Sequence, residues 1–200
     1  MAKERFNEAQ RWLIQNWAKA HLLEDAMDTV RKRYAEICTD VVDAVQDKHP
    51  ELDWSHVYVS RETGKGGIGI GRKAWPCYYN WRVGFYVEGL RLELLASEAG
   101  DRPNASIWPG STAIRGLDPR RVDSAIHAAK PRLLAKHELR RCGKDEQFWY
   151  YVPDAPKQLI DMLMDGDGRR FVDCIAAHFD LLARFTPVLD KVVAKPSRAK

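Results

Sequence analysis

The first 49 residues contain neither glycine nor proline, and apolar side chains recur within them at heptad spacing. Positions spaced by seven from Phe6, together with the positions three residues after each, are apolar in eleven cases of twelve. A heptad pattern kept up for almost six repeats is typical of a coiled-coil helix. It predicts a helix over about residues 3–48, roughly 65–70 Å long at 1.5 Å per residue.

Two interpretations of this helix remain open. The seam could pair with a second copy of the chain, or two shorter helices with a break near residues 21–28 could pack within one domain. Further apolar residues widen the stripe, which favours more than one packing neighbour. Asn16 is the only polar seam residue and would fix the register of a dimer. The candidate seam residues are Leu13, Asn16, Leu23, Met27, Val30, Tyr34 and Ile37.

The chain after Pro50 is expected to form a body with central strands and later helices, so the predicted class is α+β. Residues 57–60 and 67–71 flank a glycine-rich turn and predict a hairpin. A second hairpin is expected from residues 82–87 and 90–95 around Glu88-Gly89. With a short strand near residues 105–108, we expect a central antiparallel sheet of about four to five strands.

The last third of the chain is expected to be helical. Asp118-Pro119 is a helix start, and the helix should run to about Arg141 with a kink or break at Pro131. Shorter helices are expected from Pro156 and from about Arg169. We therefore divide the chain into a helical arm (1–50), an α+β body (51–194) and a disordered basic tail (195–200).

Basic side chains are concentrated in one segment. The chain carries a net charge of +4, and residues 115–144 hold nine basic and three acidic side chains. Arg132, Lys136 and Arg140 are spaced by four, which predicts a basic stripe on one helical face. Such a stripe is a solvated face, a contact for phosphates, or a contact for an acidic protein. The binding candidates in this segment are Arg120, Arg121, Lys130, Arg132, Lys136, Arg140 and Arg141.

A GxGxxG spacing within residues 64–71 is the second candidate binding element. A dinucleotide site needs a helix directly after the glycines, but Ala74-Trp75-Pro76 is a poor helix start. The segment also lacks the Ser or Thr of a P-loop. A flexible hairpin is favoured, and a phosphate or nucleic-acid contact by Lys65, Arg72 and Lys73 is the alternative.

The residues that usually carry chemistry do not form a complete catalytic set. Glu93 lacks the lysine that follows it in metal-dependent nucleases, and no two histidines have the spacing of a zinc pair. Cys38 and Cys174 lie on apolar helical faces and are expected to fill the core as free thiols. We expect no enzyme, no metal and no cofactor. Since no membrane span or signal peptide is predicted, the expected compartment is the cytoplasm.

Several strings in the middle and end of the chain resemble a bacterial and phage family of PD-(D/E)XK nuclease-related proteins. The similarity covers about residues 55–190, and the matching strings are Val57–Glu62, Arg72–Trp75, Val83–Phe85, Phe148–Tyr151 and the region Leu159–Phe185. The nuclease ligands of that family lie in an N-terminal half with no counterpart here. The resemblance therefore implies an accessory half without the active site, in a setting of phage–host conflict.

The sequence thus predicts a non-enzymatic protein-binding or assembly factor. The resemblance adds the expectation of a phage or prophage protein that acts on a host defence complex, such as an inhibitor of the anti-CRISPR type. The alternative is a nucleic-acid-binding protein derived from a nuclease, which would use the basic segment 115–144. The expected partner is another protein or a nucleoprotein complex, with a nucleic acid or a second copy as alternatives and no membrane.

Overall fold

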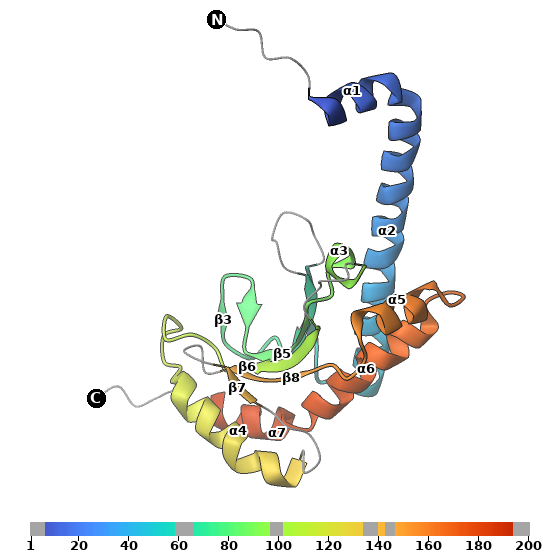
Figure 1. Cartoon of the computed structure of the whole chain (residues 1–200). Helices are drawn as coiled ribbons and strands as arrows, with labels where there is room; N and C mark the ends of the chain where they lie inside the picture. Colours follow the sequence, from blue (N-terminus) through green and yellow to red (C-terminus); the bar gives the residue numbers. More distant parts are fainter. Residues whose placement is uncertain (1–6, 59–65, 97–101, 134–139, 143–146, 194–200) are drawn as a thin grey trace, which may run out of the picture. The chain divides into compact units, whose positions relative to one another are not determined.

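The computed structural model describes residues 7–58, 66–96, 102–133, 140–142 and 147–193 (Figure 1). For residues 130–133, 140–142 and 147–151 only the backbone is described. Contacts divide the chain into two units, Met1–Glu36 and Ile37–Lys200. The helix that follows Asn16 runs through the boundary between the units, whereas the predicted division at residue 50 follows the end of that helix.

The first unit is helical. Helix α1 (Glu8–Gln15) begins with a capping box, in which the Asn7 side chain accepts from the Gln10 N–H at 2.9 Å and the Gln10 side chain accepts from the Asn7 N–H at 2.9 Å. Helix α2 (Trp17–Lys48) starts after Asn16 and ends two residues before Pro50. The expected long N-terminal helix is confirmed as α2, preceded by the short α1; the chain breaks at Asn16, and the predicted break near residues 21–28 is wrong.

Asn16 makes this break because its own polar groups satisfy the end of α1. Its backbone N–H and its side-chain amide both donate to the Trp12 carbonyl, at 2.9 and 3.0 Å. Its carbonyl accepts from the Ala20 N–H at 2.9 Å, which starts the hydrogen-bond pattern of α2. Asparagine competes with the helical backbone for such bonds, and a continuous coiled-coil seam is therefore interrupted here.

The second unit is an antiparallel sheet with helices packed against it, so the α+β class is confirmed. The sheet has six strands in the order β1-β2-β5-β6-β8-β7, somewhat more than expected, and β3 and β4 pair separately. The strands are β1 (Trp54–Val57), β2 (Gly67–Gly71), β3 (Cys77–Tyr78), β4 (Trp81–Arg82), β5 (Gly84–Glu88), β6 (Asn104–Trp108), β7 (Arg140–Cys142) and β8 (Gln147–Tyr151).

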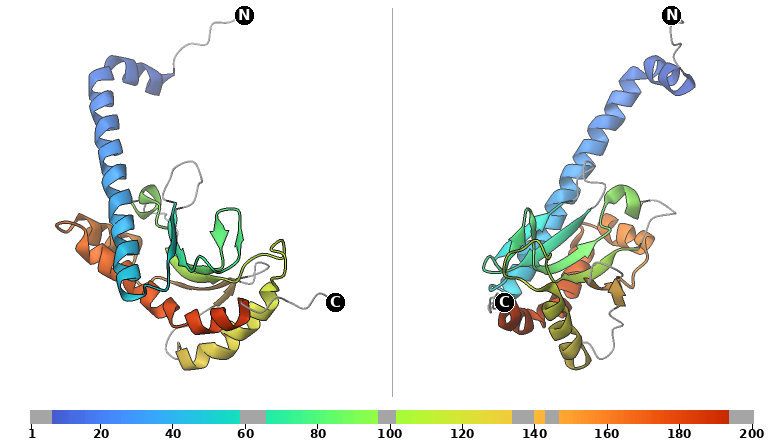
Figure 2. Two further views of the ribbon diagram at one scale, coloured as in Figure 1. Left: turned by 180° about the vertical axis from the view of Figure 1, so that it is seen from behind. Right: turned by 90° about the vertical axis from the view of Figure 1, so that its left-hand side faces the viewer.

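One face of the sheet forms the core. Ile70 pairs with Phe85, and Phe85 pairs in turn with Ile107, so alternate residues of β2, β5 and β6 present fully buried apolar side chains to one side. Helix α6 packs against β5 and β6 on the body. Figures 1 and 2 show α6 and α7 on one side of the sheet and the β3–β4 hairpin on the other. The helices of this unit are α3 (Leu92–Leu95), α4 (Pro119–Leu133), α5 (Pro156–Met164), α6 (Arg169–Ala183) and α7 (Thr186–Val193), together with the end of α2.

A hairpin with Gly67–Gly71 as its second strand is confirmed, but its first strand is Trp54–Val57 and not residues 57–60, of which 59 and 60 lie outside the described residues; the second predicted hairpin is wrong. Strand β1 pairs antiparallel with β2, but β5 pairs with β2 and β6 and not with residues 90–95. After Gly89 the chain enters α3, and Leu90 and Leu95 are both buried. The alternation of apolar and polar residues in this segment is therefore explained by one short helical turn with buried ends.

The predicted helix to about Arg141 is wrong at its end, and residues 134–139 lie outside the described part of the chain. Asp118 accepts from the Arg120 N–H at 3.0 Å and α4 begins at Pro119, as expected, but the helix is described only to Leu133. Arg140–Cys142 form strand β7, which pairs with β8 at the edge of the sheet. Strand pairing has overridden the helical spacing of the charges, because a sheet edge offers backbone hydrogen bonds to the segment.

Candidate protein-binding surface

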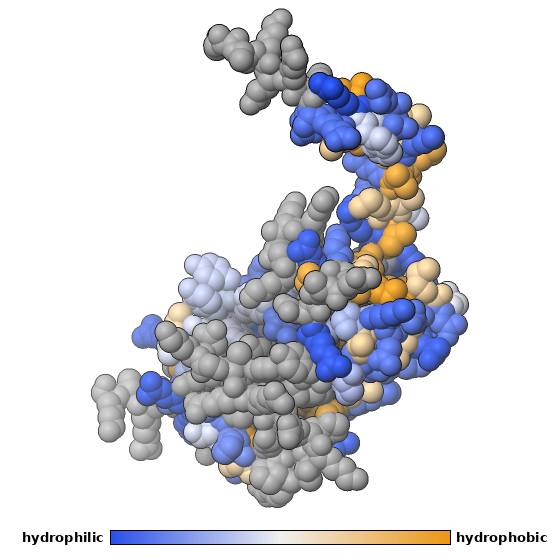
Figure 3. All heavy atoms as spheres, in the orientation of Figure 1, coloured by the Kyte–Doolittle hydropathy of each residue, from blue (hydrophilic) through white to orange (hydrophobic). Residues whose placement is uncertain are grey.

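The described part of the first unit exposes an unusual number of large apolar side chains. In Figure 3 orange atoms lie along the arm formed by α1 and the N-terminal turns of α2, among blue hydrophilic ones. A soluble monomer rarely keeps a contiguous apolar patch of this kind without a binding role. The exposed residues, each at least 44% accessible, are Trp12, Leu13, Ile14, Trp17, Leu22, Leu23, Met27 and Val30.

The predicted seam splits into two halves with different environments. Leu23, Met27 and Val30 are 58%, 50% and 52% exposed, whereas Tyr34 and Ile37 are buried at 3% and 4%. From Tyr34 onward the seam residues are buried within the chain, and the seam residues of the N-terminal half are exposed; we call this exposed part the open half. The buried half agrees with the interpretation that the stripe packs within the chain, and pairing of the open half with a second copy stays a prediction.

Two charged residues beside the open half have no ion-pair partner among the described residues. Lys19 and Glu24 are exposed and five positions apart on α2. Arg31 and Arg33, by contrast, pair within the helix with Asp28 at 2.8 Å and with Glu36 at 3.1 Å. Lys19 and Glu24 therefore retain charges that an approaching surface can complement.

The glycine-rich segment is explained by packing against aromatic rings. The glycines of β2 share one face with Tyr58 and Tyr86, and its isoleucines point to the core. A Cβ on Gly69 would lie 2.5 Å from Tyr86 Cε1, and one on Gly67 would lie 2.6 Å from the Tyr58 hydroxyl. Side chains have no room at these positions. Packing therefore explains the glycines, and phosphate binding is not required to account for them.

The basic candidates next to this strand have structural contacts. Arg72 forms an ion pair with Asp190 of α7, and Trp75 donates its indole N–H to the same carboxylate at 2.8 Å. The Lys73 side chain is exposed, and its backbone N–H donates to Asp53 at 2.7 Å, a bond that lowers the Asp53 pKa. Lys65 lies outside the described residues. Arg72 therefore has a structural contact with α7.

An aromatic cluster, which sequence reasoning missed, covers the face of the sheet opposite the core. Trp81 of β4 lies 5.1 Å from Tyr58 and 5.3 Å from Tyr86, measured between ring centroids. The Arg82 guanidinium stacks over the Trp54 ring at 5.6 Å. Alternating aromatics in residues 54–58 opposite alternating glycines in 67–71 were the available signal. Tyr58 and Tyr86 are buried, so the cluster serves mainly as a second, smaller core.

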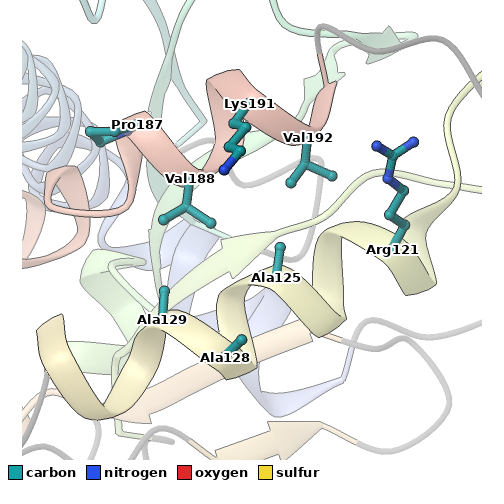
Figure 4. A pocket seen from close by; sticks show the side chains of 8 residues that line it. All are labelled: Arg121, Ala125, Ala128, Ala129, Pro187, Val188, Lys191 and Val192. Carbon is teal, nitrogen blue, oxygen red and sulfur yellow. The ribbon is translucent and has the colours of Figure 1, made fainter.

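The basic segment does not form the single helical stripe that its spacing predicts. Arg120 and Arg121 are exposed on α4, and Lys130 and Arg132 also belong to this helix. Arg140 and Arg141 belong to strand β7, and Lys136 lies outside the described residues. Figure 4 shows a shallow groove between α4 and α7, with Arg121 and Lys191 at its rim and alanine and valine side chains inside.

Cys174 differs from the expected core filler. Cys38 is fully buried, as expected, but Cys174 is only partly buried and lies next to His178 and Asp154. The spacing of Cys174 and His178, one helical turn apart, was the sequence signal for this cluster. A mixed cysteine–histidine pair with an aspartate from another segment is a weaker pattern in sequence than a histidine pair.

Comparison with known proteins returns no relative for this chain: no family model, curated protein or solved structure matches it. The resemblance to PD-(D/E)XK nuclease-related proteins therefore stays a prediction. Among the described helices, none combines the length and apolar character needed to cross a bilayer.

Proposed function

We propose that this chain is a non-enzymatic assembly protein that pairs with a second copy of itself through the N-terminal half of α2. The observation that carries the proposal is the open half-seam, Ala20, Leu23, Met27 and Val30, on a helix whose remaining seam is buried in its own chain. A helical face of this length is marginal in water without a packing partner. Pairing with a second copy would cover it.

The flanking charges favour a parallel pair. With Ala20 and Met27 at a positions, Lys19 occupies a g position and Glu24 occupies the following e position. In a parallel two-stranded coiled coil, g of one helix faces e of the next heptad on the partner, so Lys19 would meet Glu24 of the other copy twice by symmetry. An antiparallel pair would instead bring Lys19 toward Arg33, which is unfavourable.

The apolar area suits a weak dimer. Burying the exposed half of a leucine, methionine or valine side chain contributes roughly 1 kcal/mol, so the six side chains of a pair contribute about 6 kcal/mol. Trp17 at the margin adds to this, and the loss of motional freedom opposes it. A gain of about 6 kcal/mol corresponds to a Kd of about 40 µM, so we expect a dimer of roughly that strength or weaker.

A charge-swap experiment tests the pairing and its direction. Sedimentation equilibrium should give a mass that rises with concentration from 22.9 kDa toward twice that value. Lys19→Glu or Glu24→Lys alone should weaken the dimer about tenfold, because two attractive pairs become repulsive. The double variant should restore the original Kd, because the two signs are simply exchanged.

Lys32→Glu is the matched control, since Lys32 is exposed on the outward side of the same helix and should leave the Kd unchanged. A chain that stays monomeric at all concentrations would contradict self-pairing and leave the face to a different protein. A dimer whose Kd is the same in the wild-type chain and in the single charge-swap variants would contradict the parallel arrangement.

Two finer expectations stay predictions. A host defence complex as the eventual partner rests on the resemblance alone. Nucleic-acid binding through residues 115–144 is supported by the exposed Arg120 and Arg121, but Arg72 is engaged by Asp190 and the basic charges are split between a helix and a strand. Self-pairing through α2 is therefore the function that we favour.

A further inference from the structure

We propose that Asp154, Cys174 and His178 form a binding site for one divalent transition-metal ion, with Zn²⁺ as the ion that best suits the three side chains. Their ligand atoms all lie within 4.8 Å of one another, and all three residues are partly buried. The cluster lies in the second unit, and the proposal does not depend on self-pairing through α2.

The fold brings the three ligands together from two separate segments. Cys174 and His178 are one turn apart on α6, so they project from the same side of that helix. Asp154 lies in the short connection between β8 and α5. Helix α6 is held by fully buried Phe171, Ile175, Phe179 and Leu182, which fixes the two helical ligands before any ion arrives.

The spacing is close to that of a tetrahedral site. Cys174 Sγ and Asp154 Oδ2 are 3.4 Å apart. Ordinary Zn–S and Zn–O bond lengths at a tetrahedral angle place sulfur and oxygen about 3.6 Å apart. With a His178 ring nitrogen within 4.8 Å of both atoms, the three side chains would supply three of four positions and leave the fourth for water or an incoming ligand.

The donor set points to zinc among the common ions. Sulfur, nitrogen and oxygen donors from cysteine, histidine and aspartate are all ordinary zinc ligands, while Ca²⁺ and Mg²⁺ prefer oxygen alone. A cysteine–histidine–aspartate set also occurs in nucleophilic enzymes. Here, however, burial and the neighbouring Asp154 raise the pKa of the Cys174 thiol to about 12, so it is protonated at neutral pH and a poor nucleophile. Metal binding would replace this proton at sulfur.

Cobalt substitution tests the site directly on the full chain. Co²⁺ added to the metal-free protein should bind at one ion per chain, with a thiolate-to-cobalt charge-transfer band and the intense visible bands of tetrahedral cobalt. Zn²⁺ should displace it and abolish both. Cys174→Ser should remove the charge-transfer band, and His178→Ala should weaken Co²⁺ binding at least about tenfold.

Cys77→Ser is the matched control, because Cys77 is exposed and lies outside the cluster. This variant should keep the band. Circular dichroism of each variant separates loss of the site from loss of the fold. A spectrum without the sulfur band in the unmodified chain would overturn the proposal, as would a band that survives in Cys174→Ser. Either result would leave self-pairing through α2 unaffected.

Discussion

At the scale of single residues, the aromatic rings packed against β2 explain why this strand contains glycines. Gly67 and Gly69 face Tyr58 and Tyr86, whose rings occupy the space that side chains on this strand would need. The sequence pattern GxGxxG suggests phosphate binding, but the physical requirement is close approach of two aromatic rings to a backbone. Packing therefore explains a motif that is often read as a binding loop.

Gly69→Ala is expected to destabilise the fold by about 1–3 kcal/mol, because the new Cβ would overlap the Tyr86 ring, which is almost fully buried. Urea unfolding followed by tryptophan fluorescence measures the change. Ser55→Ala on the exposed side of β1 is the control and should stay within about 0.5 kcal/mol. Equal stability of both variants would mean that Tyr86 can move aside.

At the scale of elements, α7 is joined to the sheet by one carboxylate. Asp190 pairs with Arg72 and accepts from the Trp75 indole, whose ring packs edge-on against Phe85 at 5.6 Å. Two segments far apart in sequence, residues 72–75 and α7, thus meet at this side chain. The sequence predicted one helix from about Arg169 and not its division into α6 and α7, and contacts such as this one help to determine where α7 docks.

Asp190→Ala is expected to lower the free energy of unfolding by about 1–2 kcal/mol, a value reduced for the partial exposure of the pair. The loss has a physical source in the unpaired indole N–H of Trp75, which is buried. Asp173→Ala, which removes the well-exposed pair with Arg169, is the control and should change stability by less than about 0.5 kcal/mol. Thermal and urea unfolding should agree in order; a larger loss in the control would contradict the assignment.

At the scale of the whole molecule, helix α2 runs through two units, and its apolar stripe has a different environment in each. Before Tyr34 the apolar stripe of α2 is exposed, and after it the same stripe is buried. Local stability should differ accordingly, since exposed helical turns open more readily than packed ones.

Amide hydrogen exchange is expected to be at least about tenfold faster over residues 22–30 than over residues 41–46 at low protein concentration. As concentration rises, self-pairing should slow exchange in residues 22–30 and leave residues 41–46 unchanged. Uniform exchange along α2 at all concentrations would argue against an open half-seam. The Lys19→Glu variant provides the control in which the concentration effect should be lost.

Much of the architecture could be predicted from the sequence because its signals are local. The heptad pattern and the absence of glycine and proline gave the helical arm, Pro50 gave its end, and Asp118-Pro119 and Pro156 gave two helix starts. Hydrogen bonds and steric limits within a few residues determine these features. These local signals could not predict how the helices and strands pack against one another.

The break at Asn16 is also local, but it comes from a choice of hydrogen-bond partner and does not follow from periodicity. Long-range contacts decided the rest: strand β7 comes from pairing with β8. The approach of Asp154 to Cys174 joins residues twenty positions apart through the packing of α6. The sequence by itself determined that a long amphipathic helix precedes an α+β body. Tertiary structure decided how much of that helix is buried, because burial depends on which face the body covers.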